Sequence, residues 1–75
     1  MEKEEFKQKV REDLLEGIYP DDDGRPSKLS EEEVDEMLSD YDYLLDDMIA
    51  RRQEYKTEQF WIQATAYRIW TVDAC

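Results

Sequence analysis

Apolar residues recur every three or four positions over most of this chain, which is the pattern of α-helices that bury one face. Phe6, Val10, Leu14 and Ile18 are spaced by four and predict a first helix over about residues 2–16. Gly17 follows directly, and glycine is the residue that most often closes a helix. The first apolar stripe therefore predicts one helix with a defined end.

A loop over residues 17–29 is predicted by turn-forming composition. Two prolines, Gly24 and three aspartates lie between Tyr19 and Pro26, and such a run cannot continue a helix. Ser30 and Glu33 then form the sequence signature of a capping box, with Leu29 and Val34 as the flanking hydrophobic staple. A second helix is predicted to begin at Glu31.

Spacings of three and four continue from Val34 to Ile49, so helices are predicted over about residues 31–72. Ser39 followed by Asp42 repeats the capping pattern weakly, which favours a break near residue 39. Residues 60–72 are ambiguous, because their apolar side chains point in nearly every helical direction. No second strand-like run could pair with them, so we interpret the segment as a helix covered by other helices or across a dimer.

The expected fold is all-α: one domain over residues 1–75, built as a small bundle of three to four helices. A domain of this size buries only about 60–65% of its unfolded surface, so completion of the core by dimerisation or by a partner is left open. The predicted core comprises Phe6, Val10, Leu14, Ile18, Val34, Leu38, Leu45, Met48, Ile62, Ala66 and Ile69. Aromatic residues often anchor interface centres, and those expected at a partner surface are Tyr41, Tyr55, Trp61, Tyr67 and Trp70.

Composition argues against several classes of function. The chain has no histidine, its one cysteine is Cys75, and it has two glycines, so it offers no Ser-His or Cys-His pair, zinc site or phosphate loop. We expect no enzyme, no cofactor and no metal. Neither a signal peptide nor a membrane-spanning run is visible, which makes the cytoplasm the default location.

One stretch resembles a metal loop in part. The run Asp21-Asp22-Asp23-Gly24 is similar to the acidic centre of an EF-hand, where acids precede a glycine at position six. With Gly24 at six, Tyr19 occupies the first ligand position and Ser30 the twelfth. Since that register loses two ligands, a solvated turn is the better interpretation, and a calcium response that Asp21→Ala and Asp23→Ala erase is the alternative.

The negative charge is concentrated in one part of the chain. Between Glu12 and Asp47 there are fifteen acids and only two cations, Arg25 and Lys28, within a total net charge of −11. Five like-charge pairs lie four residues apart and should weaken their helices slightly: Glu12/Glu16, Glu31/Asp35, Glu32/Glu36, Glu36/Asp40 and Asp42/Asp46. Either these charges serve only to keep the protein soluble, or a cationic partner compensates them when it binds.

This charge favours a basic partner over direct binding of nucleic acid, whose phosphates need a positive face. Residues 31–47 hold nine acids over about 26 Å of helix, a density of the same order as duplex DNA. In composition the chain resembles DNA-mimic inhibitors of phages and mobile elements, including small anti-CRISPR and anti-restriction proteins, although no motif assigns it to a family.

The leading hypothesis is a non-catalytic protein that blocks a basic, nucleic-acid-binding surface by charge mimicry. The predicted contacts are Glu31, Glu32, Asp35, Glu36, Asp40, Asp42, Asp46 and Asp47, with Trp61 and Trp70 as apolar anchors. The alternative is a helical adaptor or homodimer that associates through its apolar C-terminal helix.

Overall fold

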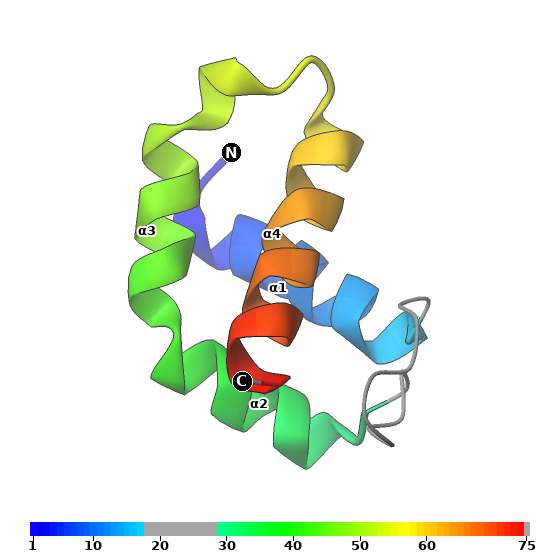
Figure 1. Cartoon of the computed structure of the whole chain (residues 1–75). Helices are drawn as coiled ribbons and strands as arrows, with labels where there is room; N and C mark the ends of the chain where they lie inside the picture. Colours follow the sequence, from blue (N-terminus) through cyan, green and yellow to red (C-terminus); the bar gives the residue numbers. More distant parts are fainter. Residues whose placement is uncertain (18–28, 75) are drawn as a thin grey trace.

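The protein is a bundle of helices. A computed structural model describes residues 1–17 and 29–74 (Figure 1). Over these residues the chain forms α1 (Lys3–Glu16), α2 (Glu31–Asp40), α3 (Asp42–Ala50), a 3-10 helix η1 (Arg52–Glu54) and α4 (Glu58–Ala74), with no strand. The predicted all-α class, and a helix rather than a strand over residues 60–72, are confirmed.

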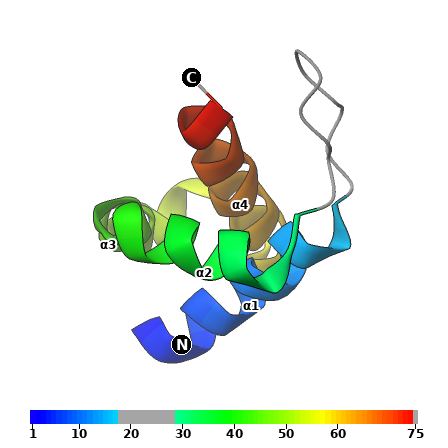
Figure 2. The ribbon, with the colours of Figure 1, turned by 90° about the horizontal axis from the view of Figure 1, so that it is seen from below.

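Helices α1, α2 and α3 all pack against helix α4. It lies beside α3 and runs in the opposite direction, while α1 crosses behind it and α2 crosses near its C-terminal end (Figure 1). Seen from below, α2 crosses in front of the other helices, and it contacts both α1 and α4 (Figure 2). In the part of the chain that the structure describes, no helix is long and apolar enough to cross a membrane.

Local signals set the end of α1 and the start of α2 as predicted. Gly17 closes α1 with φ of 64°, a left-handed conformation that costs glycine nothing. Ser30 caps α2: the Glu33 N–H donates to Ser30 Oγ (3.2 Å) and the Ser30 N–H donates to Glu33 Oε1 (3.3 Å). Leu29 and Val34, the expected staple, are both buried.

The break between α2 and α3 lies at Tyr41, slightly beyond the predicted position near residue 39. Ser39 stays inside α2 and is exposed, and α3 begins without a side-chain cap. Tyr41 donates its N–H to Met37 O (2.9 Å), while its own carbonyl accepts from Leu44 (2.9 Å). The backbone therefore turns at a residue packed against the core, rather than at the Ser39–Asp42 pattern.

A second break, between α3 and α4, was left open by the expectation of three to four helices, but its position was not predicted. Residues 51–57 form η1 and a bend. The sequence signal for a new helix start here is Thr57. Its Oγ1 accepts a hydrogen bond from the Phe60 N–H (3.1 Å) and so caps the first turn of α4. Arg52 closes the turn by donating from Nη1 to the Tyr55 carbonyl (3.0 Å).

The core contains every predicted core residue that the structure describes; Ile18 lies outside the described residues. It also contains Leu29, Met37, Leu44, Trp61 and Trp70. The prediction that Trp61 and Trp70 lie at a surface is wrong, because they are only 3% and 2% exposed. Both belong to α4, which needs apolar residues on several sides since three helices pack on it.

Trp61 joins three helices. Its ring stacks on Phe6 of α1, with 4.0 Å between the ring centroids and 11° between the planes. Its Nε1–H donates to the carbonyl of Met48 in α3 (2.7 Å), and the Arg52 guanidinium lies 5.1 Å from its ring centroid. The indole thus anchors α4 beside the end of α3.

Candidate functional site

The acids predicted as partner contacts lie on α2 and α3, and each of them is exposed or half-buried. Helical spacing divides those of α2 between two sides of the helix. Glu31 and Asp35 face α1, whereas Glu32, Glu36 and Asp40 follow each other at a spacing of four on another side, where Glu36 and Asp40 line a hollow with Asp73 of α4. The structure therefore does not present the acids as one array.

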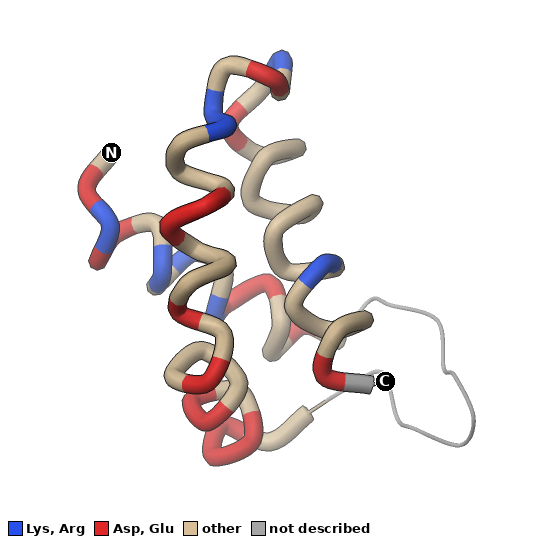
Figure 3. The backbone as a smooth tube through the Cα atoms, turned by 60° about the vertical axis from the view of Figure 1, so that its left-hand side comes forward, with Lys and Arg blue, Asp and Glu red and all other residues tan. Residues whose placement is uncertain are grey.

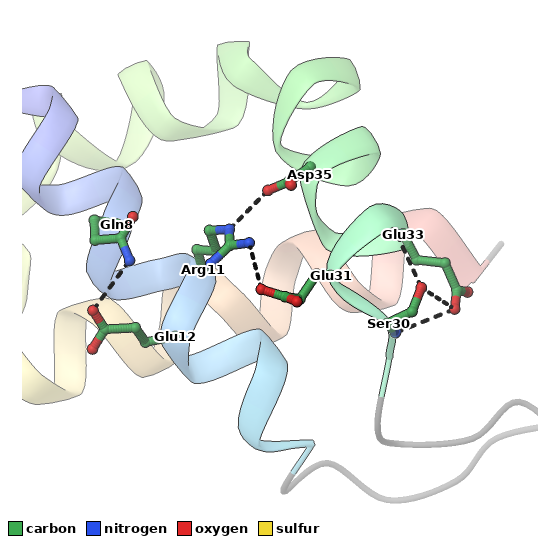
Figure 4. Close-up of polar contacts among 7 residues, drawn as sticks. All are labelled: Gln8, Arg11, Glu12, Ser30, Glu31, Glu33 and Asp35. Carbon is green, nitrogen blue, oxygen red and sulfur yellow. Dashed lines mark hydrogen bonds and ion pairs between the residues drawn. The ribbon is translucent and has the colours of Figure 1, made fainter.

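The pair Glu31/Asp35 is bridged by one cation of α1. Arg11 Nε lies 2.8 Å from Asp35 Oδ1, and Arg11 Nη2 lies 3.2 Å from Glu31 Oε1 (Figure 4). The hydrogen bond from Arg11 holds the pKa of Asp35 below its ordinary value, and the same bond raises the pKa of Arg11. This like-charge pair is compensated inside the molecule.

The pair Asp42/Asp46 is compensated in the same way. Lys3 Nζ lies 2.8 Å from Asp42 Oδ2 and 3.0 Å from Asp46 Oδ1. Hydrogen bonds to the two carboxylates raise the pKa of Lys3. Since Lys3 and Arg11 are both on α1, that helix supplies the cations for two of the five like-charge pairs seen in the sequence.

Asp47 is paired with two arginines. Arg68 of α4 donates from Nη1 to Asp47 Oδ2 (2.7 Å), and Arg51 Nε lies 3.3 Å from the same oxygen. The bond from Arg68 is the main reason that the pKa of Asp47 lies below its ordinary value. The ion pair between Asp47 and Arg68 therefore links α3 to α4.

These pairs correct the sequence-based site. Of the eight predicted acidic contacts, five are occupied by the protein's own cations: Glu31, Asp35, Asp42, Asp46 and Asp47. The three that form no ion pair with a described residue are Glu32, Glu36 and Asp40, and we call them the outer stripe of α2. Each of them has an exposed side chain.

A shallow acidic hollow adjoins the outer stripe. It has a volume of about 240 Å³ and is lined by Glu33, Glu36, Met37, Asp40 and Asp73. Asp73 comes from the end of α4, where it accepts a hydrogen bond from Tyr41. Burial, assisted by the nearby Asp73 charge, raises the pKa of Tyr41. The outer stripe therefore borders a wider acidic surface.

In the described ranges, 1–17 and 29–74, no group of three or more His, Cys, Asp or Glu side chains has the geometry to hold a metal ion. The EF-hand-like run Asp21–Gly24 lies outside the described residues.

Of the aromatic residues expected at a surface, Tyr67 is exposed (48%), whereas Tyr41 and Tyr55 are half-buried. Helix α4 also exposes Phe60 (59%), which sequence reasoning missed. The spacing of seven between Phe60 and Tyr67 could have identified this face, since seven residues are two helical turns. The apolar residues on the buried side of the helix obscured it.

Comparisons with protein-family models, with curated proteins and with solved structures each gave no match. The function is therefore argued from this chain's own residues.

Proposed function

We propose that this protein is a non-catalytic binding protein that docks its outer stripe of α2 onto a basic surface of another protein. The observation that carries the proposal is the contrast between neighbouring acids. Glu31 and Asp35 share an ion pair with Arg11, whereas Glu32, Glu36 and Asp40 on the same helix have no ion pair with a described residue.

The spacing of the outer stripe limits the kind of surface it fits. Its members are four residues apart, or about 6 Å along the helix axis. Duplex DNA carries one charge per about 1.7 Å of axis, and one strand one per about 3.4 Å. The stripe is therefore severalfold sparser than a duplex and about half as dense as one strand. It suits a short basic patch of roughly 12 Å better than a channel that holds a whole duplex.

Electrostatics supports a cationic partner. The pairs Glu32/Glu36 and Glu36/Asp40 keep like charges on neighbouring turns, which weakens the helix until a cation lies between them. Arg11 and Lys3 provide that cation for two other pairs, so the protein itself shows the arrangement that a partner's arginine or lysine would repeat. Covering a nucleic-acid-binding patch in this way is the action of the inhibitors that the composition resembles.

The test is capture of basic proteins from a lysate of the source cell, followed by elution with a DNA duplex. The variant Glu32→Gln/Glu36→Gln/Asp40→Asn should capture about tenfold less target, because contacts with three charges are lost. Elution by the duplex would identify the covered surface as one that binds nucleic acid. Capture should also weaken steeply as salt is raised.

A charge-matched control separates the stripe from bulk charge. Glu4→Gln/Glu5→Gln/Glu16→Gln removes three exposed acids from α1 and changes the net charge by the same amount. This control should capture as much target as the unmodified protein. If both triple variants lose capture equally, only net charge matters and the outer stripe is not the site.

A further inference from the structure

Tyr43 of α3 is the most exposed large apolar residue that the structure describes, with 61% of its surface accessible. Its ring lies against that of Tyr41, with 6.3 Å between the ring centroids and 58° between the planes. Tyr41 is half-buried and packs against the core. The Tyr43 ring is therefore held on one side, while most of it stays open to a partner.

Tyr43 lies at the end of the outer stripe. A helical side chain covers the turn that precedes its own Cα, and for Tyr43 that turn is the junction of α2 and α3, where Asp40 ends α2. The pKa of Tyr41 shows the same neighbourhood. It is raised first by burial and then by Asp73, Asp40 and Tyr43. Since Asp40 and Asp73 line the acidic hollow, the exposed ring and the hollow adjoin each other.

The acids around Tyr43 differ in their partners. In Figure 3 red segments follow one another along α2 and into α3. The acids of α3 are paired with the protein's own cations: Asp42 and Asp46 with Lys3, and Asp47 with Arg51 and Arg68. Arg68, the cation of α4 on this side, is engaged by Asp47 at 2.7 Å. Asp40 is the acid beside Tyr43 that has no ion pair with a described residue.

We propose that Tyr43 and Asp40 form a site for one arginine side chain of the basic partner, whose guanidinium stacks on the Tyr43 ring and donates to the Asp40 carboxylate. This site rests on the proposed function, because it is the group with which the partner meets the end of the outer stripe. Charge complementarity selects a cation, and the exposed ring selects arginine over lysine. A guanidinium is planar and can lie on a ring while it donates from its edge, whereas an ammonium is a compact and strongly hydrated point charge.

The protein makes both contacts with its own arginines. The Arg52 guanidinium lies 5.1 Å from the centroid of the Trp61 ring. Arg11 donates from Nε and Nη2 to two carboxylates at once, those of Asp35 and Glu31. At the end of the outer stripe a ring and a carboxylate stand together, and neither contacts a cation of the described residues. An arginine of the partner would complete the same arrangement there.

Two synthetic peptides of about 15 residues test the site. Both are alanine-based helices with three cations at a spacing of four, which matches the spacing of about 6 Å in the outer stripe. One peptide carries arginines and the other lysines, so their net charges are equal. NMR titration of the whole chain at low salt should show that the arginine peptide binds about two- to fivefold more tightly, which is the gain of a cation–π contact at an exposed site.

Tyr43→Leu should remove this preference by weakening the arginine peptide alone, because leucine keeps the apolar bulk and favours the helix but has no ring. Tyr43→Phe keeps the ring and should keep the preference. The matched control is Phe60→Leu on α4, since Phe60 is 59% and Tyr43 61% exposed. This control should bind both peptides like the unmodified chain, with circular dichroism confirming that all three variants fold.

Equal affinity for the two peptides overturns the arginine site, as does a preference that survives Tyr43→Leu or that Phe60→Leu also removes. Absence of binding by either peptide overturns it too. The proposed function fails separately, when the triple variant of the outer stripe captures as much protein from the lysate as the unmodified chain. If that variant loses capture while Tyr43→Leu changes neither peptide's affinity, the outer stripe is the site and the arginine contact is wrong.

Discussion

Two cations on α1 decide how the acids of α2 and α3 are held. Lys3 and Arg11 are eight residues apart, or about 12 Å along the helix. Each one bridges two carboxylates that are four residues apart on the opposing helix. In each pair the two carboxylates repel each other within their own helix, but both are attracted to one cation of α1. The ion pairs therefore hold α2 and α3 to α1. All these groups are at least partly exposed, so salt should screen the effect.

Acid should weaken the protein partly through Asp35. Its pKa is lower in the folded protein than the unfolded value of about 3.9. The bond with Arg11 therefore stabilises the fold fully above that value, and the contribution is lost as pH falls through the folded pKa. Urea unfolding between pH 6 and pH 2.5 should show a smaller loss for Arg11→Gln than for the unmodified chain.

The control for this pH dependence is Lys9→Gln, which removes one charge from α1 at a residue without an ion pair among the described side chains. It should follow the pH profile of the unmodified chain. Identical profiles for Arg11→Gln and the unmodified chain would show that the Arg11–Asp35 bond adds no stability.

Ser30 provides a second test on the scale of one residue. Ser30→Ala removes the acceptor for the Glu33 N–H and should lower the free energy of unfolding by about 1 kcal/mol. Ser39→Ala is the matched control, because Ser39 is an exposed serine inside the same helix. There alanine has the higher helix propensity, so the change should be neutral or slightly stabilising. Equal effects at the two sites, measured by urea unfolding, would contradict the capping role.

On the scale of elements, α4 determines the assembly of the bundle. It contacts α1, α2 and α3, and six of its residues, Trp61, Ile62, Thr65, Ala66, Ile69 and Trp70, are buried. The buried Thr65 hydroxyl is satisfied by donating to the carbonyl of Trp61 (2.8 Å). Because apolar residues occur on several sides of α4, three helices can pack on it.

Trp61→Phe tests how α4 is anchored to α3. Phenylalanine keeps an aromatic ring beside Phe6 but removes the hydrogen bond from the indole to the Met48 carbonyl. Loss of that buried bond, together with the smaller ring, should lower the free energy of unfolding by roughly 1–3 kcal/mol. Chemical denaturation measures the change. An unchanged midpoint would mean that solvent or the Arg51 N–H, which also donates to this carbonyl, replaces the bond.

On the scale of the whole molecule, the acids of α2 and α3 fall into two groups. On the side toward α1, Lys3 and Arg11 each bridge two acids, which halves the negative charge there, whereas the outer stripe of α2 forms no ion pair with a described residue. Phe60→Glu should leave capture through the outer stripe intact, because Phe60 lies on α4 and not on α2.

Much of the fold could be predicted because its signals are local. The four-residue spacing from Phe6 to Leu14, the helix end at Gly17 and the capping box of Ser30 and Glu33 each depend on neighbours within a few residues. The position of the turn over residues 51–57 was missed, although Thr57 provides a cap, because the apolar spacing before it gave no sign of a helix end. The acidic site was only partly predicted, because the cations that occupy five of its acids lie elsewhere in the chain.

The sequence by itself determined the helices, the class of fold and most of the core, since helix formation and apolar burial follow from short-range patterns. Tertiary structure alone decided which acids remain available. Lys3 reaches Asp42 across 39 positions, and Arg11 reaches Asp35 across 24. It also placed Trp61 and Trp70 inside and Phe60 and Tyr67 outside. Helical periodicity gives the relative directions of side chains on α4, but only the packing of α1, α2 and α3 decides which direction is buried.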